Sequence, residues 1–202
     1  MIQALYLRGK VLSSDIEKFK LALLRESKVA FLDIIENFEL EGIYSLCLYN
    51  SGDSWSYLFP SFSTKVGLSK VASDYKGDEY YREKSLDYLE NDLRWSPCDS
   101  PNHELYVSAF PESETHLEKI VKEMDQHWDN GREDKYSDIN EKLVSVCISC
   151  LQQLEKDNVF SKLERGTFVL NVLNGDQSDE ERLERAEKLN PSDVFLRYSN
   201  EI

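Results

Sequence analysis

The feature that most constrains the fold of this chain is the dominance of long helical periodicity over short β-rich runs. Apolar residues recur at helical spacing through residues 14–37 and again through residues 137–156. Only three runs are short and rich in β-forming residues: 43–49, 55–59 and 168–173. Turn-forming residues at 50–53 join the first two runs into an antiparallel hairpin. We therefore expect an α+β fold, with a small, mainly antiparallel sheet packed against several helices in a single domain over residues 1–202.

Local signals place the boundaries of the remaining elements. Ser14 followed by Glu17 has the spacing of a capping box and predicts the start of the first helix. Pro60 is expected to end the second strand, and residues 103–110 to form a short strand or the start of a helix. Further helices are predicted over 63–75, 80–93, 113–128 and 178–189, with a last short turn over 192–198.

The chain has a large excess of acidic residues. It holds 24 Lys and Arg against 38 Asp and Glu, for a net charge of −14. Such a surface repels phosphate backbones, so we expect no nucleic-acid partner. It attracts basic proteins and speeds their encounter, which favours a basic, toxin-like protein partner. The same charge is also typical of an acidic protein kept soluble by its surface, and it leaves the oligomeric state undecided.

The cysteines and the apolar segments bear on compartment. No run approaches 18 apolar residues and no basic lead precedes an apolar core, so we expect no membrane partner and a cytoplasmic protein. Four cysteines in a chain of this length do not indicate a disulfide framework. Cys147 and Cys150 match C-x-x-C, but they lie inside a predicted helix on its apolar face. We interpret them as core residues rather than a redox site.

One stretch concentrates unusual residues, namely "LRWSPCDSPNHE" at residues 93–104. Cys98 and His103 could begin a metal site completed by Asp99 or Glu104, but the spacing matches no zinc pattern, and we expect no metal or cofactor. The same two residues could form a nucleophile and its base, although such dyads are not usually recognised by local spacing. The two Ser-Pro pairs instead favour a rigid corner that docks Trp95 on the core.

A rigid corner can also present a binding surface. The residues that we expect to form such a surface are Arg94, Trp95, Asp99, His103 and Glu104. We assign no catalytic residue, because the chain contains no phosphate-binding glycine loop and no nucleophile-elbow motif.

Several stretches, in this order and spacing, resemble a known family. They are residues 42–49, the segment 93–97 containing R-W-S-P, "LQQLEKDNVF" at 151–160, "FVLNVLNGD" at 168–176, and the segment 188–191 containing L-N-P. With them the chain resembles the bacterial family called domain of unknown function 4303, over roughly residues 14–198. Small acidic bacterial families of this kind are often found among immunity proteins that neutralise a toxin, so the resemblance implies such a role by analogy.

Charge and the lack of a catalytic motif together favour a cytosolic acidic binding protein, in the form of an immunity-type inhibitor of a basic toxin, over an enzyme. An enzyme or small-ligand-binding protein that uses the loop from Arg94 to Glu104 is the first alternative. A structural or regulatory interaction module is the second.

Overall fold

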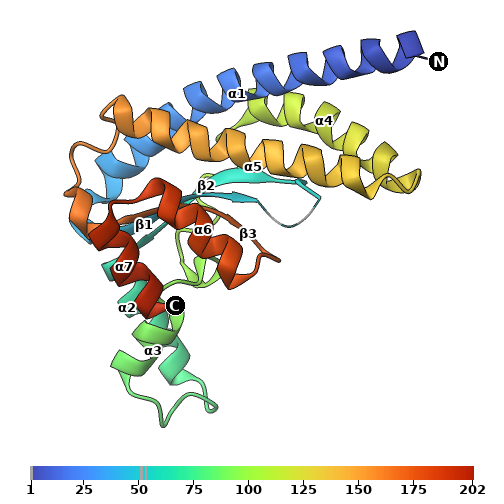
Figure 1. Ribbon diagram of the computed structural model, residues 1–202. Coiled ribbons are helices and arrows are strands. Elements are labelled where there is room, and N and C mark those ends of the chain that lie inside the picture. Colours follow the sequence, from blue (N-terminus) through green and yellow to red (C-terminus); the bar gives the residue numbers. More distant parts are fainter. Residues whose placement is uncertain (1, 51, 53) are drawn as a thin grey trace.

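The computed structural model describes residues 2–50, 52 and 54–202, with side chains from residue 12 onward. Ser51 and Asp53 of the predicted turn lie outside the described residues. The helices are α1 (Ile2–Phe38), α2 (Lys65–Gly77), α3 (Leu86–Leu93), α4 (Pro111–Asp129), α5 (Glu133–Lys156), α6 (Asp179–Leu189) and α7 (Ser192–Glu201). The strands are β1 (Ile43–Asn50), β2 (Leu58–Thr64) and β3 (Val169–Asn174). Together they form the predicted α+β fold (Figure 1).

The three strands form a mixed sheet in the order β2-β1-β3. β1 pairs antiparallel with β2, as predicted for the hairpin, whereas β3 lies parallel to β1. The sheet is therefore mixed rather than mainly antiparallel. The reason is the connection: β3 returns to the sheet only after four α-helices, α2 to α5, and such long connections can join parallel strands.

One face of the sheet is covered by a helical layer made of α1, α4 and α5 (Figure 1). The strand residues that point to this layer are wholly or almost wholly buried: Leu46, Leu48, Phe62, Leu170 and Val172. They pack against the apolar faces of the helices, which include Phe31 on α1 and Leu143 on α5. Glu26 on α1 also accepts hydrogen bonds from the backbone N–H groups of Glu112 and Ser113, at 2.8 and 2.9 Å, and so caps the start of α4.

The free edge of β3 is covered by α6 and by the residue that follows it. The Asn190 side chain donates to the carbonyl of Leu170 at 2.8 Å and accepts from the N–H of Leu170 at 2.9 Å. It also donates to the last-turn carbonyl of Ala186 at 2.7 Å. One amide thus pairs both backbone groups of Leu170 and caps the end of the helix, which blocks the strand ladder at this position.

The opposite face of the sheet is covered in pieces. Tyr44 packs with α2 and α3 at one end, whereas Val169 packs with α6 and with Val194 and Tyr198 of α7. Between these clusters the turns at residues 94–109 cross the sheet. This face carries the polar and sulfur-bearing side chains of the strands, among them Cys47 and Ser61.

Most helices lie where periodicity predicted them, and three expectations were wrong. α1 starts before Ser14, because a helix that gains tertiary packing can continue through a capping residue. Pro60 lies inside β2 opposite Leu48, which an edge strand tolerates because one side of it needs no donor. Residues 103–110 form turns rather than a strand or helix. Cys147 and Cys150 are buried, which confirms them as core residues.

Of the described helices, none combines the length and the apolarity needed to cross a bilayer.

Candidate functional site

The stretch from Arg94 to Glu104 is fastened to the sheet. The Ser100 hydroxyl donates to the carbonyl of Phe62 on β2 at 2.9 Å. The Tyr44 hydroxyl donates to the carbonyl of Arg94 at 2.7 Å, and burial raises the pKa of Tyr44 to about 12. The corner is thereby held at both of its ends by strand residues, so the side chains between them have fixed positions.

Trp95 packs between two tyrosines at this corner. Its ring meets Tyr44 edge-on at 5.5 Å and Tyr198 edge-on at 4.8 Å between centroids. Its indole N–H donates to Glu201 at 3.2 Å. The ring is half-buried: it seals the core on one side and forms the wall of a cavity on the other.

That cavity has a volume of about 510 Å³, within the range of small-ligand sites. It lies where α3, α6, the end of α7 and the corner meet, beside the carboxyl end of β3. The lining residues that matter for its chemistry are Tyr49, Asp92, Trp95, Cys98, Asp179, Arg182 and Glu201.

The cavity is acidic. Asp92 on α3, Asp179 on α6 and Glu201 on α7 bring three carboxylates to its lining, and all three residues are exposed. The one lining guanidinium belongs to Arg182. That guanidinium donates to the Tyr198 hydroxyl at 2.5 Å and to the carbonyl of Trp95, so its hydrogen bonds hold the wall together. The lining therefore favours a positively charged guest.

A thiol faces into this cavity with a chain of polar groups behind it. Cys98 lies in a short 3₁₀ turn, Pro97–Asp99, and its Sγ is 3.3 Å from the Tyr49 hydroxyl and 3.8 Å from Nε2 of His103. Nδ1 of His103 is 2.8 Å from the Ser61 hydroxyl on β2. Burial lowers the pKa of His103, with Glu104 opposing, so the imidazole is neutral at pH 7.

The predicted binding residues are only partly brought together. Trp95 lines the cavity, and His103 lies directly behind Cys98. Arg94 turns toward the Tyr44 ring, with its guanidinium carbon 6.0 Å from the centroid. Asp99 accepts a hydrogen bond from Tyr75 on α2 at 2.6 Å, which raises the pKa of Tyr75 to about 12. Glu104 is exposed and does not line the cavity.

Sequence reasoning missed the cavity residues that lie outside the quoted stretch. Asp92, Asp179 and Glu201 come from three helices far apart in the chain, so no local pattern could have grouped them. Tyr49 and Ser61 are signalled only by their positions on paired strands, where register places both near the corner. Among the described residues, no three His, Cys, Asp or Glu side chains are grouped in a way that could hold a metal ion.

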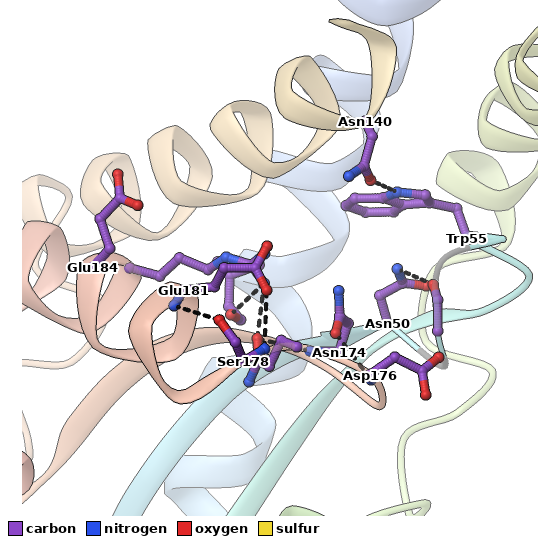
Figure 2. Close-up of polar contacts among 12 residues, drawn as sticks. Asn50, Trp55, Asn140, Asn174, Asp176, Ser178, Glu181 and Glu184 are labelled. Atoms are coloured by element: carbon purple, nitrogen blue, oxygen red, sulfur yellow. Dashed lines mark hydrogen bonds and ion pairs between the residues drawn. The ribbon is translucent and has the colours of Figure 1, made fainter. Parts of the chain in front are cut away.

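A second polar cluster lies at the carboxyl ends of β1 and β3 (Figure 2). There the Trp55 indole N–H donates to the side-chain oxygen of Asn140 on α5 at 2.6 Å. Ser178 and Glu181 cap the start of α6 by reciprocal hydrogen bonds of 3.3 and 2.9 Å. The Asn50 side chain donates to the carbonyl of Gly52 at 2.7 Å. These contacts close strand and helix ends, and we assign them a structural role.

Comparison with known proteins bears on the family. The model of the family described as Domain of unknown function (DUF4303) matches residues 23–191. The chain belongs to this family. The DUF4303 match confirms the expected resemblance, and it contains all three strands and the cavity residues from Tyr49 to Arg182, while Glu201 lies beyond it. No curated protein and no solved structure matches the chain significantly.

Two segments that carried the resemblance to DUF4303 have structural tasks. In the R-W-S-P segment, the Arg94 carbonyl receives the Tyr44 hydroxyl and Trp95 forms the cavity wall. In the L-N-P segment, Asn190 closes the edge of β3. The first segment therefore shapes the cavity, and the second keeps the strand beneath it in place.

Proposed function

We propose that this DUF4303 protein is a non-enzymatic binding protein that recognises a basic protein partner, and that the acidic cavity beside Trp95 receives a lysine or arginine side chain of that partner. The observation that carries the proposal is the convergence of Asp92, Asp179 and Glu201 on one cavity. Carboxylates from three separate helices line the same cavity, so they give its interior a negative potential that attracts a lysine or arginine side chain.

The remaining walls suit the same guest. Trp95 and Tyr49 offer aromatic rings beside the carboxylates, and a cation beside such a ring gains further attraction. Arg182 places one positive charge in the lining against three carboxylates, and its hydrogen bonds to the Tyr198 hydroxyl and the Trp95 carbonyl hold it against the wall. The net charge of −14 would draw a basic partner toward the surface before it docks.

An immunity-type inhibitor is the form of binding protein that best matches these properties. A toxin that cleaves nucleic acid needs a basic surface to hold its substrate, and an acidic protein can cover that surface as a phosphate backbone does. On this proposal the cavity binds one basic side chain of the toxin specifically, while the rest of the acidic surface increases the association rate.

The test is to measure binding of a fluorescent octa-arginine peptide by anisotropy to two charge-matched triple variants. The cavity variant combines Asp92→Asn, Asp179→Asn and Glu201→Gln. The control variant combines Glu118→Gln, Asp125→Asn and Asp129→Asn, all exposed on α4 on the other side of the sheet. We expect the cavity variant to bind about tenfold more weakly, and the control variant to stay within about twofold of the wild type.

Salt dependence and a capture experiment complete the test. Raising NaCl from about 50 to about 300 mM should weaken binding of the wild type and the control alike, because exposed charges are screened. The same three proteins should then be used to capture partners from lysate. The natural partner is the basic protein retained by the wild type and the control but lost with the cavity variant. Equal peptide binding by both triple variants would contradict the proposal.

A further inference from the structure

The four cysteines of this chain lie in two kinds of environment. Cys47, Cys147 and Cys150 are buried, and burial raises the pKa of each of these thiols, for Cys47 and Cys150 to about 12. Cys98 alone among them is exposed, and it lines the acidic cavity. Solutes can reach this thiol and a neutral imidazole lies behind it, so its reactivity differs from that of a core cysteine.

We assign the proton of the neutral His103 ring to Nδ1. This nitrogen lies 2.8 Å from the Ser61 hydroxyl oxygen, which can accept its hydrogen bond. Ser61 pairs with Cys47 across β1 and β2, so the strand register holds this hydroxyl beside the ring.

With its proton on Nδ1, the imidazole turns the lone pair of Nε2 toward Cys98, 3.8 Å from Sγ. The ring is fixed in this orientation by edge-on contacts with Tyr49 at 4.5 Å and Phe59 at 5.2 Å between centroids. Burial and the hydrogen bond with Cys98 raise the pKa of Tyr49, so its hydroxyl keeps its proton. That hydroxyl lies 3.3 Å from the Cys98 sulfur and is the donor of the pair once the sulfur is a thiolate. Nucleophile, base and orienting group thus follow one another as in activated cysteines.

We propose that Cys98 is a nucleophilic cysteine, with His103 as its base, that undergoes thiol–disulfide exchange with small disulfides entering the cavity. His103 Nε2 takes the thiol proton, and the Cys98 sulfur attacks one sulfur of the disulfide. A new sulfur–sulfur bond forms as the old one breaks, and the departing thiolate takes the proton back from His103. The Tyr49 hydroxyl stabilises the negative charge that develops on the Cys98 sulfur.

The acidic lining adds a preference among disulfides. A disulfide with positively charged arms should enter more readily than one with negatively charged arms, because Asp92, Asp179 and Glu201 surround the path to the sulfur. This preference rests on the proposed function, whereas the nucleophilicity of Cys98 does not. The two can therefore be tested separately with reagents that differ only in charge.

The experiment uses three disulfides with two-carbon arms: cystamine, which is cationic, 2-hydroxyethyl disulfide, which is neutral, and 3,3′-dithiodipropionate, which is anionic. The rate at which each adds one arm to the native protein is followed by intact mass. We expect a single adduct that Cys98→Ser abolishes. With the neutral reagent, we expect His103→Asn to slow the reaction about a hundredfold, the lower end of general-base effects.

Matched variants guard against loss of the fold. His116→Asn, a histidine of α4 away from the cavity, should react at the wild-type rate. Tyr49→Phe keeps the ring and removes only the hydroxyl, and it should slow the neutral reagent about threefold in a protein whose circular dichroism is unchanged. A wild-type rate in both folded His103→Asn and Tyr49→Phe, or an adduct that survives Cys98→Ser, would overturn the proposed site.

The charge series tests the lining separately. Cystamine should react about tenfold faster than dithiodipropionate, after correction for their rates with free cysteine, and the triple cavity variant should abolish this ratio. If this rate ratio is near one and His103→Asn reacts slowly, the acidic lining does not select among disulfides, but His103 still activates Cys98. If the ratio is large and His103→Asn reacts at the wild-type rate, the lining selects by charge, but His103 is not the base.

Discussion

The helical layer and the cavity wall lie on opposite faces of one small sheet and are built on different rules. In the layer, regular helices bury one apolar face each, and residues such as Phe31 and Leu143 are wholly buried. In the wall, turns and helix ends meet, and residues such as Trp95 and Arg182 are half-buried. The layer buries mainly apolar groups, whereas the wall holds charges and an exposed thiol within reach of solvent.

Two cysteines show the same contrast between the helical layer and the cavity wall. Cys147 in the layer and Cys98 in the wall have the same side chain, but burial keeps the first as a neutral core group while the second faces a cavity and a histidine. The lesson is that stability and chemistry are carried by different faces of this sheet. Substitutions should therefore separate them.

The largest expected effect is in the layer. Phe31→Ala removes a wholly buried ring that packs edge-on against Phe160 at 5.6 Å, and it should lower the free energy of unfolding by about 3–5 kcal/mol. Urea denaturation followed by circular dichroism measures this loss. The control Leu196→Ala removes an exposed side chain of α7 and should change the value by no more than about 0.5 kcal/mol. If Phe31→Ala lowers the free energy of unfolding as little as the control does, the helical layer does not carry the stability of the fold.

The next effect lies at the junction between strand edge and α6. Asn190→Ala leaves the N–H and the carbonyl of Leu170 without their side-chain partner, and it should cost about 2 kcal/mol in the same denaturation assay. The matched control is Asn37→Ala on α1, where the exposed amide donates to the carbonyl of Asp33 one turn earlier. That control should stay within about 0.5 kcal/mol of the wild type. Equal losses for the two variants would show that the backbone of Leu170 does not need the Asn190 amide.

A smaller effect is expected where the corner is fastened. Tyr44→Phe keeps the ring against Trp95 but removes the hydrogen bond to the carbonyl of Arg94, and it should cost about 1 kcal/mol. Thermal unfolding should show a correspondingly lower midpoint. Tyr57→Phe, which alters an exposed ring, provides the control with no expected shift. An unchanged midpoint for Tyr44→Phe would mean that the corner is held by packing alone.

The smallest expected effect is a pH dependence. Burial places the pKa of His103 in the folded protein below its ordinary value of 6.5, so the unfolded chain binds a proton more readily as the pH falls below that value. The free energy of unfolding should therefore decrease as the pH falls through 6.5. Glu104, which raises the pKa of His103, limits the change.

His103→Asn should flatten this pH dependence. Part of it should remain, because burial also lowers the pKa of His127 on α4. Denaturation curves at several pH values, with His127→Gln as a second variant, separate the two histidines. A His103→Asn protein with the full wild-type slope would place the dependence elsewhere.

Some of the site was visible in the sequence. Trp95, Cys98 and His103 were singled out from one stretch, and the structure places all three at or directly behind one cavity wall. The spacing of Cys98 and His103 does not identify a dyad, because five residues of separation do not by themselves bring two side chains together. Two short turns do so, one closed by the Ser100 N–H on the Pro97 carbonyl and the next by the His103 N–H on the Ser100 carbonyl.

Other parts of the site depend on long-range geometry. Pro60 was expected to end its strand, yet β2 continues to Thr64 and so carries Ser61 to the imidazole of His103. The carboxylates of Asp92, Asp179 and Glu201 meet only after three helices have docked. Neither fact has a local signal, because edge-strand status and helix docking are properties of the whole sheet.

What the sequence by itself determined is the set of elements that periodicity encodes: the long helices, the hairpin, the α+β class, the buried Cys147 and Cys150, and the family. These follow from which residues must leave water, and that information is local. The tertiary structure alone decided that β3 runs parallel to β1, that three helices bring their carboxylates to one cavity, and that Cys98 faces this cavity with His103 behind it. These depend on how crossovers and turns close in space, and the period of a strand or a helix contains no information about direction or docking.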